Sequence, residues 1–242
     1  MASRHNLKRN IKMSVNKNAN ILEKVKELPV VVGITGHRNV VKDDYPVLCD
    51  EIRKGLLEIK ELCKTKYGEA QTAPITMLTG LAQGADILGA KVARELGIQY
   101  VAVLPCELEK FKKSFDDEDA LRELDGYVAN ALEVVVVDDI EKAFENQSGR
   151  DEDSYRYRQV GIYIVPHSSL LVAMWDGKPP KSKFGCGTTD VVSLALDNDC
   201  PVMWIRCRRA GDGSKRNVTR SYLLPPNKYF TAKTKTSYCT MQ

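Results

Sequence analysis

The chain has 242 residues, of which 43% are hydrophobic and 28% are charged, a composition suited to one large globular domain with tails. Its net charge of +4 is unevenly placed, because residues 1–28 carry +5, residues 206–242 carry +8, and the stretch between them carries −9. An acidic body disfavours a nucleic-acid groove, which needs a basic surface. The basic ends are interpreted as solvated tails, although they could contact an anionic partner.

The cysteines and the N-terminus indicate a reducing, cytoplasmic environment. The seven cysteines are odd in number and show no Cys-x-x-Cys spacing, which argues against a disulfide framework and a zinc site. The N-terminus is polar without a signal-peptide core, and no apolar run approaches the ~20 residues of a membrane span. We therefore expect a cytoplasmic protein with no metal, no cofactor and no membrane span.

Strands and helices are expected to alternate along the chain. Apolar runs predict strands at 30–35, 74–78, 100–104, 133–137, 169–175 and 201–206. Helices are predicted at 21–28, 47–66, 86–96, 106–130, 155–165 and 188–196, with loops at 141–154 and 178–187. This order predicts an α/β, Rossmann-like fold with a mostly parallel sheet of about six strands and helices on both faces. The domain is expected at 29–206, between a basic N-terminal tail (1–28) and a basic C-terminal extension (207–242).

The loop after the first predicted strand is the first candidate for a ligand site. Ligands of open parallel sheets bind at the carboxyl ends of the strands. Here the strand ends in Gly33-Ile34-Thr35-Gly36-His37-Arg38. Gly36 would let the backbone approach a ligand closely, and the Arg38 guanidinium suits a phosphate. His37 is the one histidine placed for chemistry. The alternative is a plain strand-to-helix turn with a surface arginine.

Two further loops place glycines directly before a helix. The loop after the second strand contains Gly80, Leu81, Ala82, Gln83 and Gly84, and the helix amides that follow would form an anion site. Asp86 in its first turn either contacts the ligand or only stabilises the helix. The second glycine-rich helix start contains Gly185, Gly187, Thr188, Thr189 and Asp190, in which a threonine either caps the helix or donates to phosphate. Together the two helix starts favour a phosphate or diphosphate cradle.

The fifth predicted strand ends in Trp175-Asp176-Gly177. We expect Trp175 in the core and Asp176 near a ribose hydroxyl. Arg156, Tyr157 and Arg158 fall on a predicted helix, where solvation is the favoured role. No Ser-His-Asp arrangement, HExxH motif or Walker motif is visible, so no catalytic residue is assigned.

Taken in order, these loops resemble the SLOG superfamily, which is named for the DNA-processing protein DprA (Smf) and the LOG cytokinin-activating enzymes. The matching segments are 32–38, 80–86, 173–177 and 187–192, which span nearly the whole body. The resemblance extends to the SLOG domains of melastatin channels and bacterial anti-phage effectors. It implies a Rossmann-like domain that binds a nucleotide or ADP-ribose-type signal, coupled to homo-oligomerisation and to an effector domain or partner protein.

One departure from the superfamily disfavours hydrolysis. LOG enzymes carry Pro-Gly-Gly-x-Gly-Thr-x-x-Glu, and aligning Gly187-Thr188 with its Gly-Thr places Val191 at the catalytic glutamate and Phe184 at the first glycine. A valine cannot perform acid–base chemistry on an N-glycosidic bond. The leading hypothesis is therefore a non-catalytic sensor. A LOG-type nucleoside-monophosphate phosphoribohydrolase and a DprA-like single-stranded DNA-binding protein stay as alternatives, the latter disfavoured by the acidic body.

Overall fold

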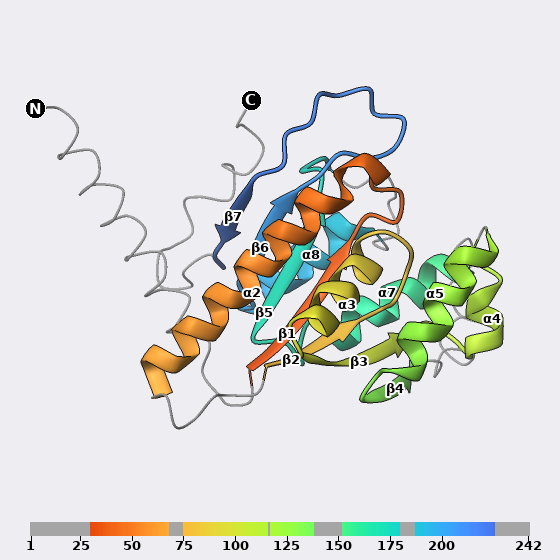
Figure 1. The fold of residues 1–242 in the computed structure, drawn as a ribbon, viewed down its shortest axis with the longest axis horizontal. Helices are drawn as coiled ribbons and strands as arrows, with labels where there is room; N and C mark the ends of the chain where they lie inside the picture. The colour runs from red at the N-terminus through yellow and green to blue at the C-terminus, as the bar shows by residue number, and fades with distance from the viewer. Residues whose placement is uncertain (1–29, 68–74, 116, 138–151, 180–186, 226–242) are drawn as a thin grey trace, which may run out of the picture.

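The computed structural model describes residues 30–67, 75–115, 117–137, 152–179 and 187–225 (Figure 1). Several predicted features lie outside these residues: the tail 1–28 with its helix at 21–28, most of the loops 141–154 and 178–187, and Gly185.

The described strands form one seven-stranded sheet in the order β4-β3-β2-β1-β5-β6-β7. Six strands are parallel, and β7 pairs antiparallel with β6 at one edge. Their bounds are β1 (Val30–Gly36), β2 (Ile75–Thr79), β3 (Gln99–Leu104), β4 (Glu133–Val136), β5 (Leu170–Trp175), β6 (Val202–Arg206) and β7 (Arg220–Leu223). The predicted α/β class, with its mostly parallel sheet, is confirmed.

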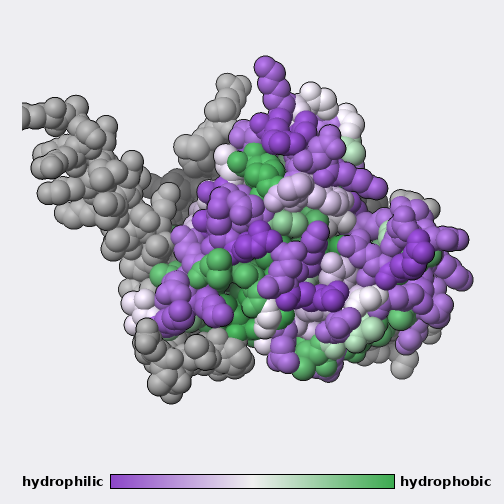
Figure 2. Space-filling view, viewed as in Figure 1, coloured by the Kyte–Doolittle hydropathy of each residue, from purple (hydrophilic) through white to green (hydrophobic). Residues whose placement is uncertain are grey.

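Helices cover both faces of this sheet (Figure 1). On one face lie α2 (Tyr45–Tyr67), which follows the short 3-10 turn η1 (Lys42–Asp44), α3 (Ala85–Glu95) and α5 (Glu118–Ala129), preceded by α4 (Leu108–Lys112). On the other face lie α7 (Glu152–Ile164) and α8 (Thr188–Asp197). Figure 2 shows the first face, where hydrophilic residues surround smaller apolar patches.

The sequence of β1 explains why it is central. Val30, Val32 and Ile34 alternate toward the core beneath α2 and α3, and all three are essentially fully buried. Gly33 faces α7, where an added Cβ would lie 2.6 Å from Cγ2 of Ile164. Its lack of a side chain therefore lets α7 approach the sheet closely.

Three sequence expectations are corrected. The stretch 106–130 is two helices rather than one, because Asp117 interrupts it and its carboxylate caps α5 by accepting from the Ala120 amide at 2.7 Å. Arg156 is buried, with 6% of its surface exposed, rather than solvated. The sheet also continues past residue 206 into β7, so the folded domain extends beyond the predicted boundary.

Among the described residues, no helix combines the length and apolar character needed to cross a membrane.

Candidate functional site

The chain reverses its direction of travel across the sheet between β1 and β5. From β1 it adds β2, β3 and β4 on one side, and it then returns to place β5 and β6 on the other side of β1. In parallel sheets the loops on the two sides of such a switch point diverge and leave a crevice beyond the carboxyl ends of the strands.

A cavity of about 460 Å³ lies at this switch point. Of the predicted ligand-binding residues, twelve line it: Thr35, Gly36, His37, Arg38, Gly80, Ala82, Asp86, Asp176, Gly187, Thr188, Thr189 and Asp190. Apolar side chains of α7 and the start of α8 complete one side, including Val160, Ile164 and Val191. This volume falls in the usual range for small-molecule sites, about 300–1,000 Å³.

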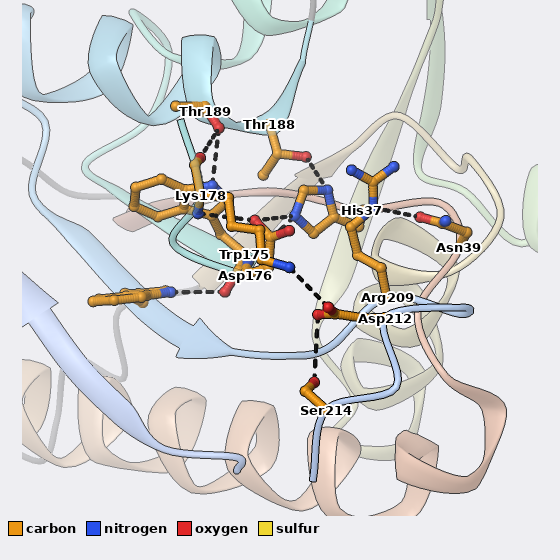
Figure 3. A network of polar contacts seen from close by, with 11 residues as sticks. His37, Asn39, Trp175, Asp176, Lys178, Thr188, Thr189, Arg209, Asp212 and Ser214 are labelled. Atoms are coloured by element: carbon orange, nitrogen blue, oxygen red, sulfur yellow. Dashed lines mark hydrogen bonds and ion pairs between the residues drawn. The ribbon is translucent and has the colours of Figure 1, made fainter. Parts of the chain in front are cut away.

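Three polar side chains from three elements meet in the cavity (Figure 3). Nε2 of His37, after β1, lies 3.0 Å from Oδ1 of Asp176, after β5. Nδ1 of the same ring lies 3.3 Å from the hydroxyl of Thr188 at the start of α8. Thr188, His37 and Asp176 thus form a hydroxyl–imidazole–carboxylate series of contacts. The sequence did not reveal it, because the contacting residues are 151 and 139 positions apart.

The Asp176 carboxylate is held in its ionised form. Burial opposes its ionisation, but the Lys178 amide at 3.1 Å and the His37 ring outweigh burial and hold the pKa of Asp176 below its ordinary value. Nε2 of His37 faces both the carboxylate of Asp176 and its backbone amide, which donates to Nε2 at 3.2 Å. The tautomer of the ring sets which of Nδ1 and the Thr188 hydroxyl donates.

Asp86 has the opposite electrostatic environment. Burial raises its pKa to about 7, although the Ala82 amide at 3.4 Å and the positive charge of Arg38 both favour the ionised form. Asp86 is a partly exposed residue that lines the cavity. It therefore exchanges a proton near neutral pH, unlike Asp176.

Arg38 lines the cavity with its guanidinium turned toward protein partners. Nη2 donates to the Ser114 carbonyl at 2.7 Å, Nη1 donates to the Tyr157 hydroxyl at 3.2 Å, and the group lies 5.5 Å from the centre of the Tyr157 ring. These contacts join the β1 loop to α7 and to the segment after α4. The predicted phosphate-neutralising arginine thus already has a structural role.

The predicted glycine cradle is in large part a packing device. An added Cβ on Gly36 would lie 2.3 Å from Cβ of Ala85, and one on Gly84 would lie 2.4 Å from the carbonyl oxygen of Arg38. Gly84 also has φ of 81°, which other residues rarely adopt. The Ala85 amide donates to the His37 carbonyl at 3.2 Å, so this helix start binds the β1 loop. Of the predicted residues that the structure describes, Gly33, Leu81, Gln83 and Gly84 do not line the cavity.

Polar groups at the start of α8 also form hydrogen bonds with other groups of the protein. The Asp190 carboxylate accepts from the Gly187 amide at 2.9 Å. The Thr189 hydroxyl donates to the Lys178 carbonyl at 2.9 Å and accepts from Nε1 of Trp175 at 2.9 Å. Trp175 is half-buried and packs against Trp204, with ring centres 5.3 Å apart. Thr188 is the hydroxyl of this helix start that is turned toward His37.

One wall of the cavity was not predicted from the sequence. Arg209 lines it from the loop between β6 and β7 (residues 207–219), together with Asn39, Tyr157, Lys178 and Pro179. This β6–β7 loop was interpreted as a tail because it is polar and rich in arginine. The sequence favours solvation for Tyr157, with contact to the pocket as the alternative, and the structure places Tyr157 in the cavity lining.

Ion pairs hold the β6–β7 loop against the rest of the domain. Asp44 of η1 is fully buried, and its carboxylate accepts from Arg208 Nε and Arg216 Nε at 2.6 Å each. The hydrogen bond from Arg208 lowers the pKa of Asp44, and the hydrogen bond from Arg216 lowers it further. Together they outweigh burial, which acts to raise this pKa. Lys178 Nζ pairs with Asp212 at 2.8 Å. The loop is therefore tied to the domain by charged groups at several points.

Backbone contacts and a buried thiol complete the attachment of the loop. The Ala210 amide donates to the Asn39 carbonyl at 2.7 Å. Cys207, at the start of the loop, is buried, and its amide donates to the Trp175 carbonyl at 3.2 Å. Burial raises the pKa of the Cys207 thiol to about 12.

The seven-stranded order, with its switch point between β1 and β5, decides the fold. It is Rossmann-like. No protein-family model matches the sequence, and no curated protein matches it.

Three solved structures are similar to this chain at low sequence identity. DNA processing protein A (DprA) from Streptococcus pneumoniae has 17% identity and a TM-score of 0.47, covering 80% of this chain and 54% of its own. DNA processing protein A from Helicobacter pylori, described for its single-stranded DNA binding mode, has 16% identity and a TM-score of 0.44, covering 79% of this chain and 69% of its own. The protein TM1055, a structural genomics target, has 16% identity and a TM-score of 0.38, with 72% of each chain covered. This chain thus spans about half the length of the Streptococcus protein.

Within the described part of the chain, no group of three or more His, Cys, Asp or Glu side chains is arranged to hold a metal ion.

Proposed function

We propose that the protein binds a nucleotide-derived ligand of the ADP-ribose type in the cavity between β1 and β5 and acts as a sensor rather than an enzyme. The observation that carries the proposal is the meeting of His37, Asp176 and Thr188 in a cavity at the switch point of a Rossmann-like sheet. Sites there suit ligands with a flat apolar part and polar sugar or phosphate groups.

The lining supplies both kinds of contact. The apolar side chains Val160, Ile164 and Val191 suit a base or the carbon face of a sugar. The Asp176 carboxylate and the His37 ring suit ribose hydroxyls, which both donate and accept. The glycines at 36 and 80 also line the cavity, and their lack of a side chain allows Ala85 and Asp86 to pack closely against these loops.

The position of Val191 favours binding without hydrolysis. It lines the cavity at the place that the LOG motif assigns to a glutamate, and its Cγ2 would lie 2.7 Å from a Cβ added to Gly161 of α7. A packed aliphatic side chain can neither protonate a leaving group nor stabilise an oxocarbenium ion. Ligand occupancy would instead be transmitted to a second copy of the chain, or to an effector, as the SLOG resemblance implies.

A thermal-shift panel tests this function. The probes are AMP, ADP-ribose, cyclic ADP-ribose isomers, NAD, cyclic dinucleotides and inorganic phosphate. A ligand at ~100 times its Kd stabilises the native state by about 2.7 kcal/mol, which raises Tm by several degrees. We expect a shift with an ADP-ribose-type compound that is recovered intact. Asp176→Asn should reduce that shift, whereas the matched surface variant Asp197→Asn should keep it.

Other outcomes separate the alternatives. A shift with AMP accompanied by free adenine would replace the sensor with a phosphoribohydrolase. If no nucleotide shifts Tm and single-stranded DNA binds with a steep salt dependence, the protein is a DNA-binding protein instead. No response to any probe would overturn the nucleotide site.

A further inference from the structure

The two arginines that line the cavity differ in what their guanidinium groups already contact. Both terminal nitrogens of Arg38 donate hydrogen bonds within the protein, one to the Ser114 carbonyl and one to the Tyr157 hydroxyl. Within the described residues, the side-chain hydrogen bond of Arg209 is made by Nε alone, to Oδ1 of Asn39 at 2.9 Å. The two terminal nitrogens of the Arg209 guanidinium are therefore available to donate hydrogen bonds to another group.

The position of these two nitrogens suits an anion in the cavity. Figure 3 shows the Arg209 guanidinium beside the His37 ring, with its terminal nitrogens turned toward the side on which Thr188 lies. The carboxylates close enough to Arg209 to feel its charge, Asp176 and Asp212, have other partners: Asp176 contacts His37, and Asp212 pairs with Lys178. A planar guanidinium with two terminal nitrogens available matches two oxygens of a phosphate.

The backbone of Arg209 is fixed before any ligand arrives. Val40 and Arg209 form an antiparallel bridge, the Val41 amide donates to the Arg208 carbonyl at 3.3 Å, and Arg208 itself is held by the buried Asp44. The Asn39 contact then orients the side chain through Nε. Such an arrangement lowers the entropy cost of ordering a long side chain on binding.

We infer that Arg209, rather than Arg38, holds the phosphate of the ligand, in a phosphate subsite formed where the β6–β7 loop meets the β1 loop. The inference rests on the proposed nucleotide function and adds to it the residue that recognises the charged end. Arg38 acts as a positioning residue that joins the β1 loop to α7.

Calorimetric titration of the full chain with ADP-ribose and with adenosine tests the subsite, because adenosine offers the same base and ribose without phosphate. Arg209→Gln should weaken ADP-ribose binding by about 10- to 100-fold, the range for losing a charged hydrogen-bonding group. Adenosine binding should change by less than about twofold. Arg209→Lys, which keeps the charge but loses the planar guanidinium, should fall between wild type and Arg209→Gln.

The controls separate a ligand contact from a structural role. Arg122→Gln removes the same charge from an exposed site on α5, 75% exposed, and should leave both affinities unchanged. Arg38→Gln should weaken ADP-ribose and adenosine by similar factors. Circular dichroism checks that each variant is folded.

Three results would overturn the subsite. They are an unchanged ADP-ribose affinity for Arg209→Gln, an equal loss for both ligands, or a phosphate-selective loss in Arg38→Gln alone. If the wild type bound neither probe, the proposed nucleotide function would fail. This result is distinguishable from the three that overturn only the phosphate subsite.

Discussion

Two regions of the cavity are held in place by different interactions. The glycine wall (residues 36–38 and 80–86) is fixed by close backbone packing, with Gly36 against Ala85 and Gly84 against the Arg38 carbonyl. The ion-pair wall (residues 207–219) is fixed by charged groups, chiefly Asp44 with Arg208 and Arg216. A methyl group added at Gly36 or Gly84 would collide with packed atoms, whereas the attachment of the ion-pair wall depends on the ionised state of Asp44. The two walls of the cavity can therefore be perturbed independently, one by adding a carbon and the other by removing a charge.

The largest expected effect comes from adding one carbon to the glycine wall. Gly36→Ala places a methyl group 2.3 Å from Cβ of Ala85 and 2.7 Å from the Met174 carbonyl oxygen, neither of which can move freely. We expect a loss of about 3 kcal/mol or more in the free energy of unfolding. Urea denaturation measures it.

A matched glycine gives the opposite sign. Gly126 lies in α5 with nothing within 4 Å of an added Cβ. Gly126→Ala should therefore stabilise the protein by about 0.5–1 kcal/mol, because alanine is the better helix former. Equal behaviour of the two variants would show that Gly36 has no special packing role.

Breaking the ion-pair wall should have a smaller and pH-dependent effect. Asp44→Asn leaves Arg208 and Arg216 without a charged partner, but these guanidiniums are 25% and 53% exposed and can be hydrated. We expect a loss of about 2 kcal/mol near pH 7.

The pH dependence of that loss follows from the lowered pKa of Asp44. A carboxyl with a depressed folded pKa stabilises the native state above its unfolded pKa and loses this contribution as pH falls through the folded value. The difference between wild type and Asp44→Asn should therefore shrink below about pH 4. Asp43→Asn, at the exposed neighbouring position, serves as the control, and a pH-independent difference would contradict the ion-pair explanation.

A smaller effect than that of Asp44→Asn is expected at Asp86, on the glycine wall. Its folded pKa of about 7 lies above the unfolded value, so the folded protein holds an extra proton between these values and wild-type stability falls as pH rises toward 7. Asp86→Asn removes this penalty while keeping an acceptor for the Ala82 amide. We expect the variant to be about 1 kcal/mol more stable than wild type at pH 8, because Asp86 is a partly exposed residue, and equal to it at pH 4. Thermal unfolding at both pH values tests the sign.

The sequence predicted the elements that bury a continuous apolar run or a regular stripe. The predicted strand at 169–175 and the observed β5 (Leu170–Trp175) agree within one residue, because every residue of the run packs in the core or next to it. The seventh strand was missed because Arg220–Leu223 is short and half-buried, and its arginine is satisfied by Glu51 and Glu58 of α2, more than 160 positions away. No local pattern reveals such distant partners.

The sequence predicted cavity-lining residues of two kinds, those that directly follow a strand and those at the glycine-rich start of a helix. His37 and Asp176 are of the first kind, and their relation to the switch point followed from the strand order. Arg209 lies two residues after the buried Cys207, in a stretch whose charge resembles a solvated tail. No local pattern reveals Arg209, because the loop is held by the buried Asp44 through Arg208 and Arg216, and the burial of Asp44 is visible only in the fold.

The thiol of Cys207 allows detachment of the β6–β7 loop to be measured chemically. A thiol group that is buried and protonated reacts with an alkylating reagent only in molecules whose loop has detached, so its labelling rate measures how often this happens. Cys200, also buried and with its pKa raised to about 12, lies before β6 and reports wider unfolding in the same sample. Mass spectrometry of the labelled peptides gives the ratio of the two labelling rates, which measures how often the loop detaches relative to wider unfolding. A ligand bound to Arg209 should slow labelling of Cys207 more than labelling of Cys200.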